Sequence, residues 1–146
     1  MIEGSLGIYR VATAILITAA LVWITVGASL AQEQAIIDSG KLEFDKRCAV
    51  CHGLDARGNG PLASQLKTKP ADLTQISKKN EGQFPFWQMY RTVDGRDAVE
   101  GHGTREMPVW GDNFLEEAGV DRRDAEAEVR GRILTLLFYL QSFQEK

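Results

Sequence analysis

Two cysteines and a histidine lie within five consecutive residues of this chain. The segment reads Cys48-Ala49-Val50-Cys51-His52, and it contains both cysteines of the 146-residue sequence. Cysteines at this spacing can close a disulfide, form a redox dithiol or supply half of a zinc site. The histidine directly after the second cysteine favours covalent attachment of a c-type haem instead. Each thiol would add to one vinyl group of the porphyrin, and the two-residue spacer lets both sulfurs reach vinyls on adjacent rings from one helical turn.

The histidine of this segment is a candidate iron ligand, because its imidazole would lie beneath the porphyrin ring. A histidine ligand needs its other ring nitrogen held by a hydrogen-bond acceptor, which fixes the tautomer and raises the basicity. Pro61 ends the turn Gly58-Asn59-Gly60-Pro61, nine residues after His52. It keeps a carbonyl but has no N–H, and the glycines beside it let the chain turn close to the ring. We therefore predict that the Pro61 carbonyl accepts a hydrogen bond from His52.

A second axial ligand would close the coordination of the iron, and methionine opposite histidine raises the reduction potential. The sequence has three methionines. Met1 starts the chain, and Met89 lies among aromatic residues, where methionine commonly fills a gap in the core. Met107 lies in a loop-rich stretch 55 residues after His52, with enough chain between them to reach the opposite face of the ring. We predict Met107 as the sixth ligand. His102 in its glycine-flanked loop is one alternative, and an open sixth site is another.

The start of the chain has the pattern of an export segment. Arg10 precedes an apolar run over residues 11–30, and small residues end this run at the positions that a signal peptidase inspects. Cleavage would then fall before Gln32. A run of about 20 residues is also long enough to cross a bilayer as an uncleaved helix. We expect residues 1–31 to form a signal peptide or a membrane anchor, and residues 32–146 to form one domain outside the cytoplasm.

The expected domain has helical patterning and no convincing alternation of a half-buried strand, so an all-α fold is predicted. We expect helices at residues 36–47 and 84–93, with a glycine- and proline-rich loop at 53–61 between them and another at 95–111 before the C-terminal stretch. In the first helix, Gly40 would let another helix cross closely. A third helix is expected near the C-terminus, where apolar residues recur at helical spacing on one face. These residues are Val129, Ile133, Leu136, Leu137 and Leu140.

Charge and motifs limit the partners of the chain. The formal net charge is −3, and removing residues 1–31 takes away one arginine and one glutamate, so nucleic acid is not an expected partner. Basic residues dominate residues 41–79, whereas the stretch from Glu81 onward is acidic. The basic stretch is either ordinary solvated surface or a docking patch for a redox partner. The sequence shows neither a nucleophile with an attendant base nor a phosphate loop, which are the features that would indicate an enzyme with a small-molecule substrate.

Together these residues resemble the class I cytochrome c family, in its bacterial form, over nearly the whole of residues 32–146. The haem-attachment segment is the most specific feature. The turn ending at Pro61 and the run Met107-Pro108-Val109-Trp110-Gly111 are similar to bacterial members. Gly40 and Phe44, with Leu136 and Tyr139 near the C-terminus, look like the family's contact between its terminal helices.

This resemblance implies an all-α fold in which the N- and C-terminal helices cross around one covalently bound haem, with the methionine loop over the distal face. It also implies that an aromatic side chain, here Trp87, Tyr90 or Trp110, bonds a haem propionate. The implied function is one-electron transfer in the periplasm, from a quinol-oxidising complex or a dehydrogenase to an oxidase or a reductase. The alternatives are a haem subunit of a larger oxidoreductase and a gas sensor or peroxidase with an open distal site.

Overall fold

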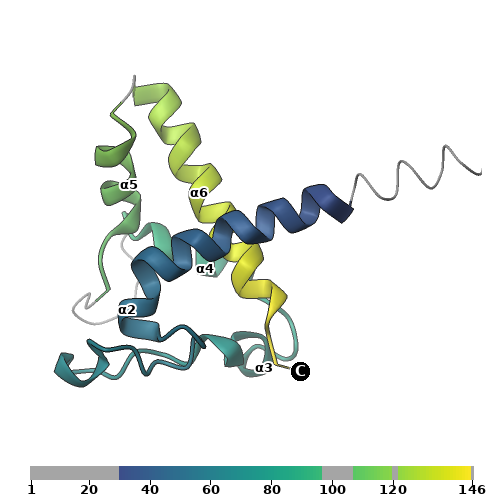
Figure 1. The fold of residues 1–146 in the computed structure, drawn as a ribbon, viewed down its shortest axis with the longest axis vertical. Helices are drawn as coiled ribbons and strands as arrows, with labels where there is room; N and C mark the ends of the chain where they lie inside the picture. Colours follow the sequence, from purple (N-terminus) through teal and green to yellow (C-terminus); the bar gives the residue numbers. More distant parts are fainter. Residues whose placement is uncertain (1–29, 97–106, 120–121, 146) are drawn as a thin grey trace, which may run out of the picture. The chain divides into compact units, whose positions relative to one another are not determined.

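The computed structural model describes residues 30–96, 107–119 and 122–145. Within these ranges every regular element is helical, as Figure 1 shows, so the prediction of an all-α fold is confirmed. Backbone contacts divide the chain between Ala35 and Ile36. The elements described below that position the site belong to the second part.

Two sequence predictions fall outside the described ranges. They concern the export segment, of which only the last two residues are described, and the alternative ligand His102. Among the residues that the structure does describe, no helix is both long and apolar enough to cross a bilayer. The signal peptide or membrane anchor over residues 1–31 therefore stays a prediction.

The first helical segment runs without a break into the cysteine segment. Residues 30–43 are followed by a π-helical turn, η1 (Phe44–Cys48), and by a short α-helix, α2 (Ala49–His52). The helix predicted at 36–47 is present but extends further at both ends. It ends at Gly53, whose φ of 81° suits a glycine.

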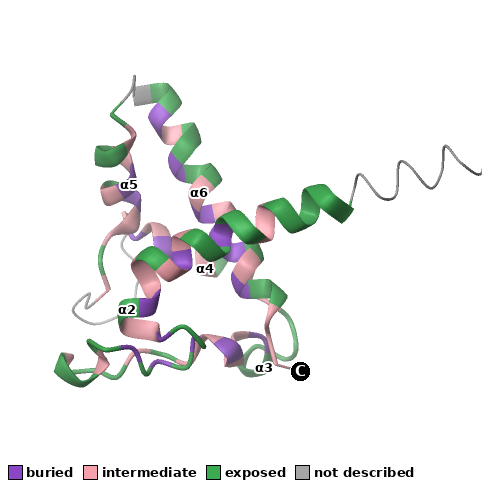
Figure 2. Ribbon diagram, in the orientation of Figure 1, coloured by how far each residue is buried: buried purple, intermediate pink, exposed green. Residues whose placement is uncertain are grey.

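The long C-terminal helix α6 (Arg122–Ser142) crosses the first helical segment (Figure 1). At the crossing, a Cβ atom on Gly40 would lie 2.0 Å from the backbone oxygen of Thr135, so only glycine allows this approach. The rings of Phe44 and Tyr139 meet with centroids 5.5 Å apart. The apolar face predicted for α6 is buried, as the purple positions in Figure 2 indicate. The predicted crossing of the terminal helices is confirmed.

Two further helices flank α6. Helix α4 (Phe86–Asp94) begins two residues later than predicted, because the residue before Pro85 is disfavoured in helical backbone. Helix α5 (Trp110–Ala118) packs against α6. Sequence analysis assigned residues 95–111 to a loop, which is wrong for Trp110 and Gly111, the first two residues of α5.

Three short turns carry the chain from the cysteine segment to α4. They are η2 (Ala63–Gln65), η3 (Leu73–Gln75) and α3 (Ile76–Lys79). Gln144, just after α6, accepts a hydrogen bond from the Ser77 N–H at 2.9 Å and donates to the Leu73 carbonyl at 2.8 Å. The end of the chain therefore holds the segment that contains η3 and α3.

Candidate cofactor site

Both cysteines lie at the end of the first helical segment as half-buried free thiols. Cys48 closes the π-helical turn, in which the Ala49 N–H donates to the Phe44 carbonyl five residues back. Such turns are frequent at functional sites. Burial, together with the nearby Glu43 carboxylate, raises the pKa of the Cys48 thiol to about 12.

His52 is held by a backbone carbonyl. Its Nδ1 atom lies 3.0 Å from the carbonyl oxygen of Ala71. A carbonyl can only accept, so Nδ1 carries the proton and Nε2 keeps a free lone pair. Burial lowers the pKa of His52, while the bond to Ala71 raises it by a smaller amount. Burial, the larger of the two effects, favours a neutral imidazole, and the bond to Ala71 leaves Nε2 as the nitrogen available to a metal.

The carbonyl that accepts this bond belongs to Ala71, and not to Pro61 as the sequence analysis predicted. The turn before Pro61 packs against the outside of α2, where the Gly60 N–H donates to the Cys51 carbonyl at 3.0 Å. Pro61 itself is exposed. The glycines of the turn were predicted to bring the chain close to the porphyrin, but Gly58 instead lies against another part of the backbone. A Cβ atom on Gly58 would lie 2.1 Å from the backbone oxygen of the residue before Ala71. Glycine at this position therefore lets the segment that contains Ala71 approach the turn closely.

Two cavities, of about 360 and 530 Å³, share Cys48, His52, Ala71 and Met107 in their walls. We refer to them together as the cleft. Their sizes lie in the range of roughly 300–1,000 Å³ that is typical of cofactor and ligand pockets. The other walls are mostly apolar. They include Phe44, Leu73, Ile76, Met89, Val93, Leu136 and Leu140 in the smaller cavity and Val50, Leu62, Leu66, Pro70, Pro108 and Trp110 in the larger one.

Met107 lies on the cleft, as the sequence prediction requires of an iron ligand. It is half-buried, packs against the core and lines both cavities from the loop before α5. Met89 lines the smaller cavity from α4. The structure thus brings Met107 together with Cys48 and His52, although these residues are far apart in the sequence.

The three aromatic candidates for a propionate partner lie in different settings. Trp110 lines the larger cavity. Tyr90 is half-buried against the core, whereas Trp87 is 67% exposed. The role of each stays a prediction, and Trp110 is the candidate that the structure places on the cleft.

Sequence analysis missed two residues of this region. Ala71 acts through its carbonyl, which no side chain signals, although the stretch Lys69-Pro70-Ala71-Asp72 has the composition of a turn. Arg47 lines the larger cavity and donates to both carboxylate oxygens of Glu117. Its partner lies 70 residues away, so periodicity and local motifs cannot reveal the pair.

Residues 35–122 match the family model described as cytochrome c oxidase, cbb3-type, subunit III. The chain belongs to the class I c-type cytochromes. No curated protein and no solved structure matches it. The family confirms the resemblance found in the sequence and makes this cytochrome a haem-binding, electron-transfer protein.

The cleft of the cytochrome suits a haem. It offers two thiols, a thioether and an imidazole whose Nε2 is free, within walls that are largely apolar. Across the described parts of the chain, no group of three or more His, Cys, Asp and Glu side chains is arranged to hold a metal ion. The zinc alternative for Cys48 and Cys51 therefore gains no support.

Proposed function

We propose that this cytochrome attaches one haem covalently through Cys48 and Cys51, ligates its iron through His52 and Met107, and carries single electrons. The observation that carries the proposal is the shared cleft. Side chains from the cysteine segment and from the loop before α5 meet there, and the Ala71 carbonyl already orients the imidazole.

Each residue of the site has a task that its chemistry explains. Each thiol adds across a vinyl double bond, so that one S–C bond forms and the thiol hydrogen passes to the neighbouring carbon. The Ala71 carbonyl keeps His52 in one tautomer, and the apolar walls exclude water. The bound haem supplies an iron that alternates between ferric and ferrous states. His52 and Met107 would hold the iron in both states, so little rearrangement would accompany each electron.

We place the cytochrome in the periplasm, soluble or tethered by residues 1–31. A quinol-oxidising complex or a dehydrogenase would supply the electron, and an oxidase or a reductase would accept it. Lys69 is exposed, lines the larger cavity and belongs to the basic stretch 41–79. Charge at the edge of the cleft favours brief encounters that weaken as salt is added.

A second candidate function is that of a haem subunit in a larger oxidoreductase. The matched family favours it, because its description names subunit III of a cbb3-type oxidase. Gentle solubilisation followed by purification distinguishes the two candidates. A free carrier elutes alone and reduces its partner at a rate that falls with added salt, whereas a subunit elutes with a stable partner.

The decisive experiment is an intact mass and an absorption spectrum of the polypeptide after acid extraction, from both soluble and membrane fractions. We expect the mass of the chain, with or without residues 1–31, to be raised by one haem. The variants Cys48→Ala and Cys51→Ala each keep one thioether, and the double variant releases its haem on extraction. A colourless polypeptide with the mass of its amino acids alone would overturn the proposal.

A further inference from the structure

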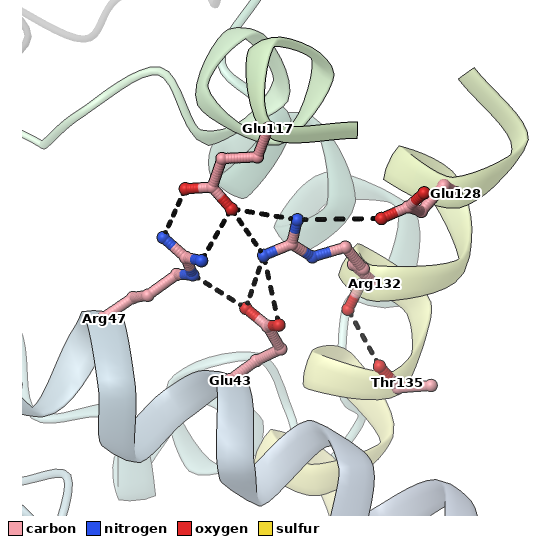
Figure 3. A network of polar contacts seen from close by, with 6 residues as sticks. All are labelled: Glu43, Arg47, Glu117, Glu128, Arg132 and Thr135. Carbon is pink, nitrogen blue, oxygen red and sulfur yellow. Dashed lines mark hydrogen bonds and ion pairs between the residues drawn. The ribbon is translucent and has the colours of Figure 1, made fainter. Parts of the chain in front are cut away.

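Four charged side chains connect the helix before Cys48 to the helix after Met107. This arginine–glutamate brace consists of Glu43, Arg47, Glu117 and Arg132 (Figure 3). Arg47 donates to the two oxygens of Glu117 at 2.7 and 2.6 Å and to Glu43 at 2.9 Å. Arg132 of α6 donates to Glu43 and Glu117 at 3.1 Å. Three helices therefore meet at one group of ion pairs.

The brace rests on an aromatic ring and is partly shielded from water. The guanidinium carbons of Arg132 and Arg47 lie 4.0 and 5.4 Å from the ring centroid of Phe114, which is 1% exposed. The side chains of Arg47 and Arg132 are only 14% and 16% exposed, whereas that of Glu117 is 42% exposed. Bidentate pairs in such settings are stronger than single pairs in open water. The brace therefore adds a polar restraint to the packing of α5 on α6.

The position of α5 limits the movement of Met107. Only Pro108 and Val109 separate Met107 from Trp110, the first residue of α5. Three residue steps span about 11 Å at most, and proline restricts the backbone further. Arg47 lies 6.0 Å from the centroid of the Trp110 ring. The brace holds α5 at Glu117, near its C-terminal end, and the helix connects that restraint to Trp110, three residues after the proposed ligand.

We propose that the Arg47–Glu117 ion pair positions Met107 over the haem, and that its loss opens the sixth coordination site to external ligands. The inference rests on the proposed function, because it takes Met107 as the ligand. Arg47 directly precedes Cys48, so one side chain holds both the attachment helix and, through Glu117, the helix after Met107. Arg47 and Glu117 are positioning residues that act through α5.

Imidazole titration of the ferric holoprotein tests the proposal, because imidazole competes with the methionine for iron. Glu117→Gln keeps the size of the side chain and removes its charge. We expect it to raise the affinity for imidazole about fivefold, the effect of weakening one ion pair. Arg47→Lys raises it as well, since an ammonium cannot match both carboxylate oxygens. Glu128→Gln is the matched control, because Glu128 approaches Arg132 only at 4.0 Å. We expect this variant to leave the imidazole affinity unchanged.

Two further variants separate positioning from general weakening of the fold. Tyr139→Leu removes a ring that packs on Phe44 and takes no part in the ion pairs of the brace, and we expect a lower melting temperature with unchanged imidazole affinity. An equal rise in affinity in this variant, or none in Glu117→Gln, would overturn the inference and leave the proposed function intact. Met107→Leu should lose the charge-transfer absorption of methionine-ligated ferric haem. A wild type without that absorption would overturn the assignment of Met107, and the inference with it.

Discussion

His52 illustrates how a backbone group prepares a side chain for metal binding. The Ala71 carbonyl fixes the proton on Nδ1, and burial keeps the ring neutral by lowering its pKa. The sequence predicts His52 as a ligand, because its place after Cys51 is a local pattern. It did not identify the acceptor, because any residue carries a carbonyl and only the folded chain decides which one comes near. The candidate side chains of the cleft could be predicted because their types and spacing are visible in the sequence. The role of the Ala71 carbonyl could not, because it depends on the folded chain.

At the scale of single residues, the two methionines of the cleft make a matched pair. We expect Met107→Leu to lower the reduction potential by on the order of 0.1 V, because a thioether ligand stabilises ferrous iron. Met89→Leu should change it far less, since leucine replaces methionine in a core position at similar volume. A potentiometric titration followed by absorption measures both. The reverse order of effects would assign the ligand to Met89.

At the scale of elements, the crossing of the terminal helices depends on Gly40, which has no side chain to keep them apart. Gly40 and Phe44 indicated this contact in the sequence, because both lie on one helical face. Helix α5 was harder to foresee, since its first turn contains Gly111, which lowers helix propensity. Its place is set by tertiary contacts: a Cβ atom on Gly111 would lie 1.8 Å from the Asp94 carboxylate, and Phe114 is buried. Neither contact can be predicted from the helix propensity of the residues in α5.

We expect Gly40→Ala to lower the free energy of unfolding by about 3 kcal/mol, because the added methyl group meets the backbone of Thr135 and forces the helices apart. Gly131→Ala in α6 is the control. Nothing lies within 4 Å of a Cβ atom there, so the variant should gain about 1 kcal/mol from helix propensity. Urea unfolding of both holoproteins gives the comparison. A neutral Gly40→Ala would show that the crossing tolerates separation.

The contact between the end of α6 and the segment around η3 yields another prediction. Gln144→Ala leaves the Ser77 N–H and the Leu73 carbonyl without their partner, so we expect a loss of about 2 kcal/mol. Hydrogen exchange should rise first at residues 73–77. Gln141→Ala, at an exposed position one turn earlier, should behave as the wild type. Unchanged exchange in Gln144→Ala would mean that the other contacts of this segment hold it alone.

At the scale of the whole molecule, acidic groups tie distant segments together, and this makes stability depend on pH. Hydrogen bonds from Gln75 and Arg57 lower the pKa of Glu145. Loss of water around Glu117 raises its pKa, but bonds from Arg132 and Arg47 outweigh this and lower it overall. A lowered pKa means that the folded state binds the proton less tightly than the unfolded chain. The stability from these groups is present above the ordinary value of 4.5 and is lost as pH falls through the lowered values.

We therefore expect the free energy of unfolding to fall as the pH is lowered from 5 to about 3. Glu117→Gln should be less stable than the wild type by about 1 kcal/mol near neutral pH, and the difference should shrink in acid because the wild-type carboxylate becomes protonated there. Urea unfolding at a series of pH values measures both curves. A constant difference across this range would show that the charge of Glu117 does not contribute.

The bond from Arg132 to Glu43 joins residues 89 positions apart. During synthesis, Cys48 and Cys51 are therefore made long before the helix that will pack against their own. Closing so long a loop is also slow compared with forming a local helix. We expect both thiols to be accessible to a porphyrin or to an oxidant during that interval. If the haem is attached as we propose, its attachment therefore competes with oxidation of the thiols before the terminal helices pack.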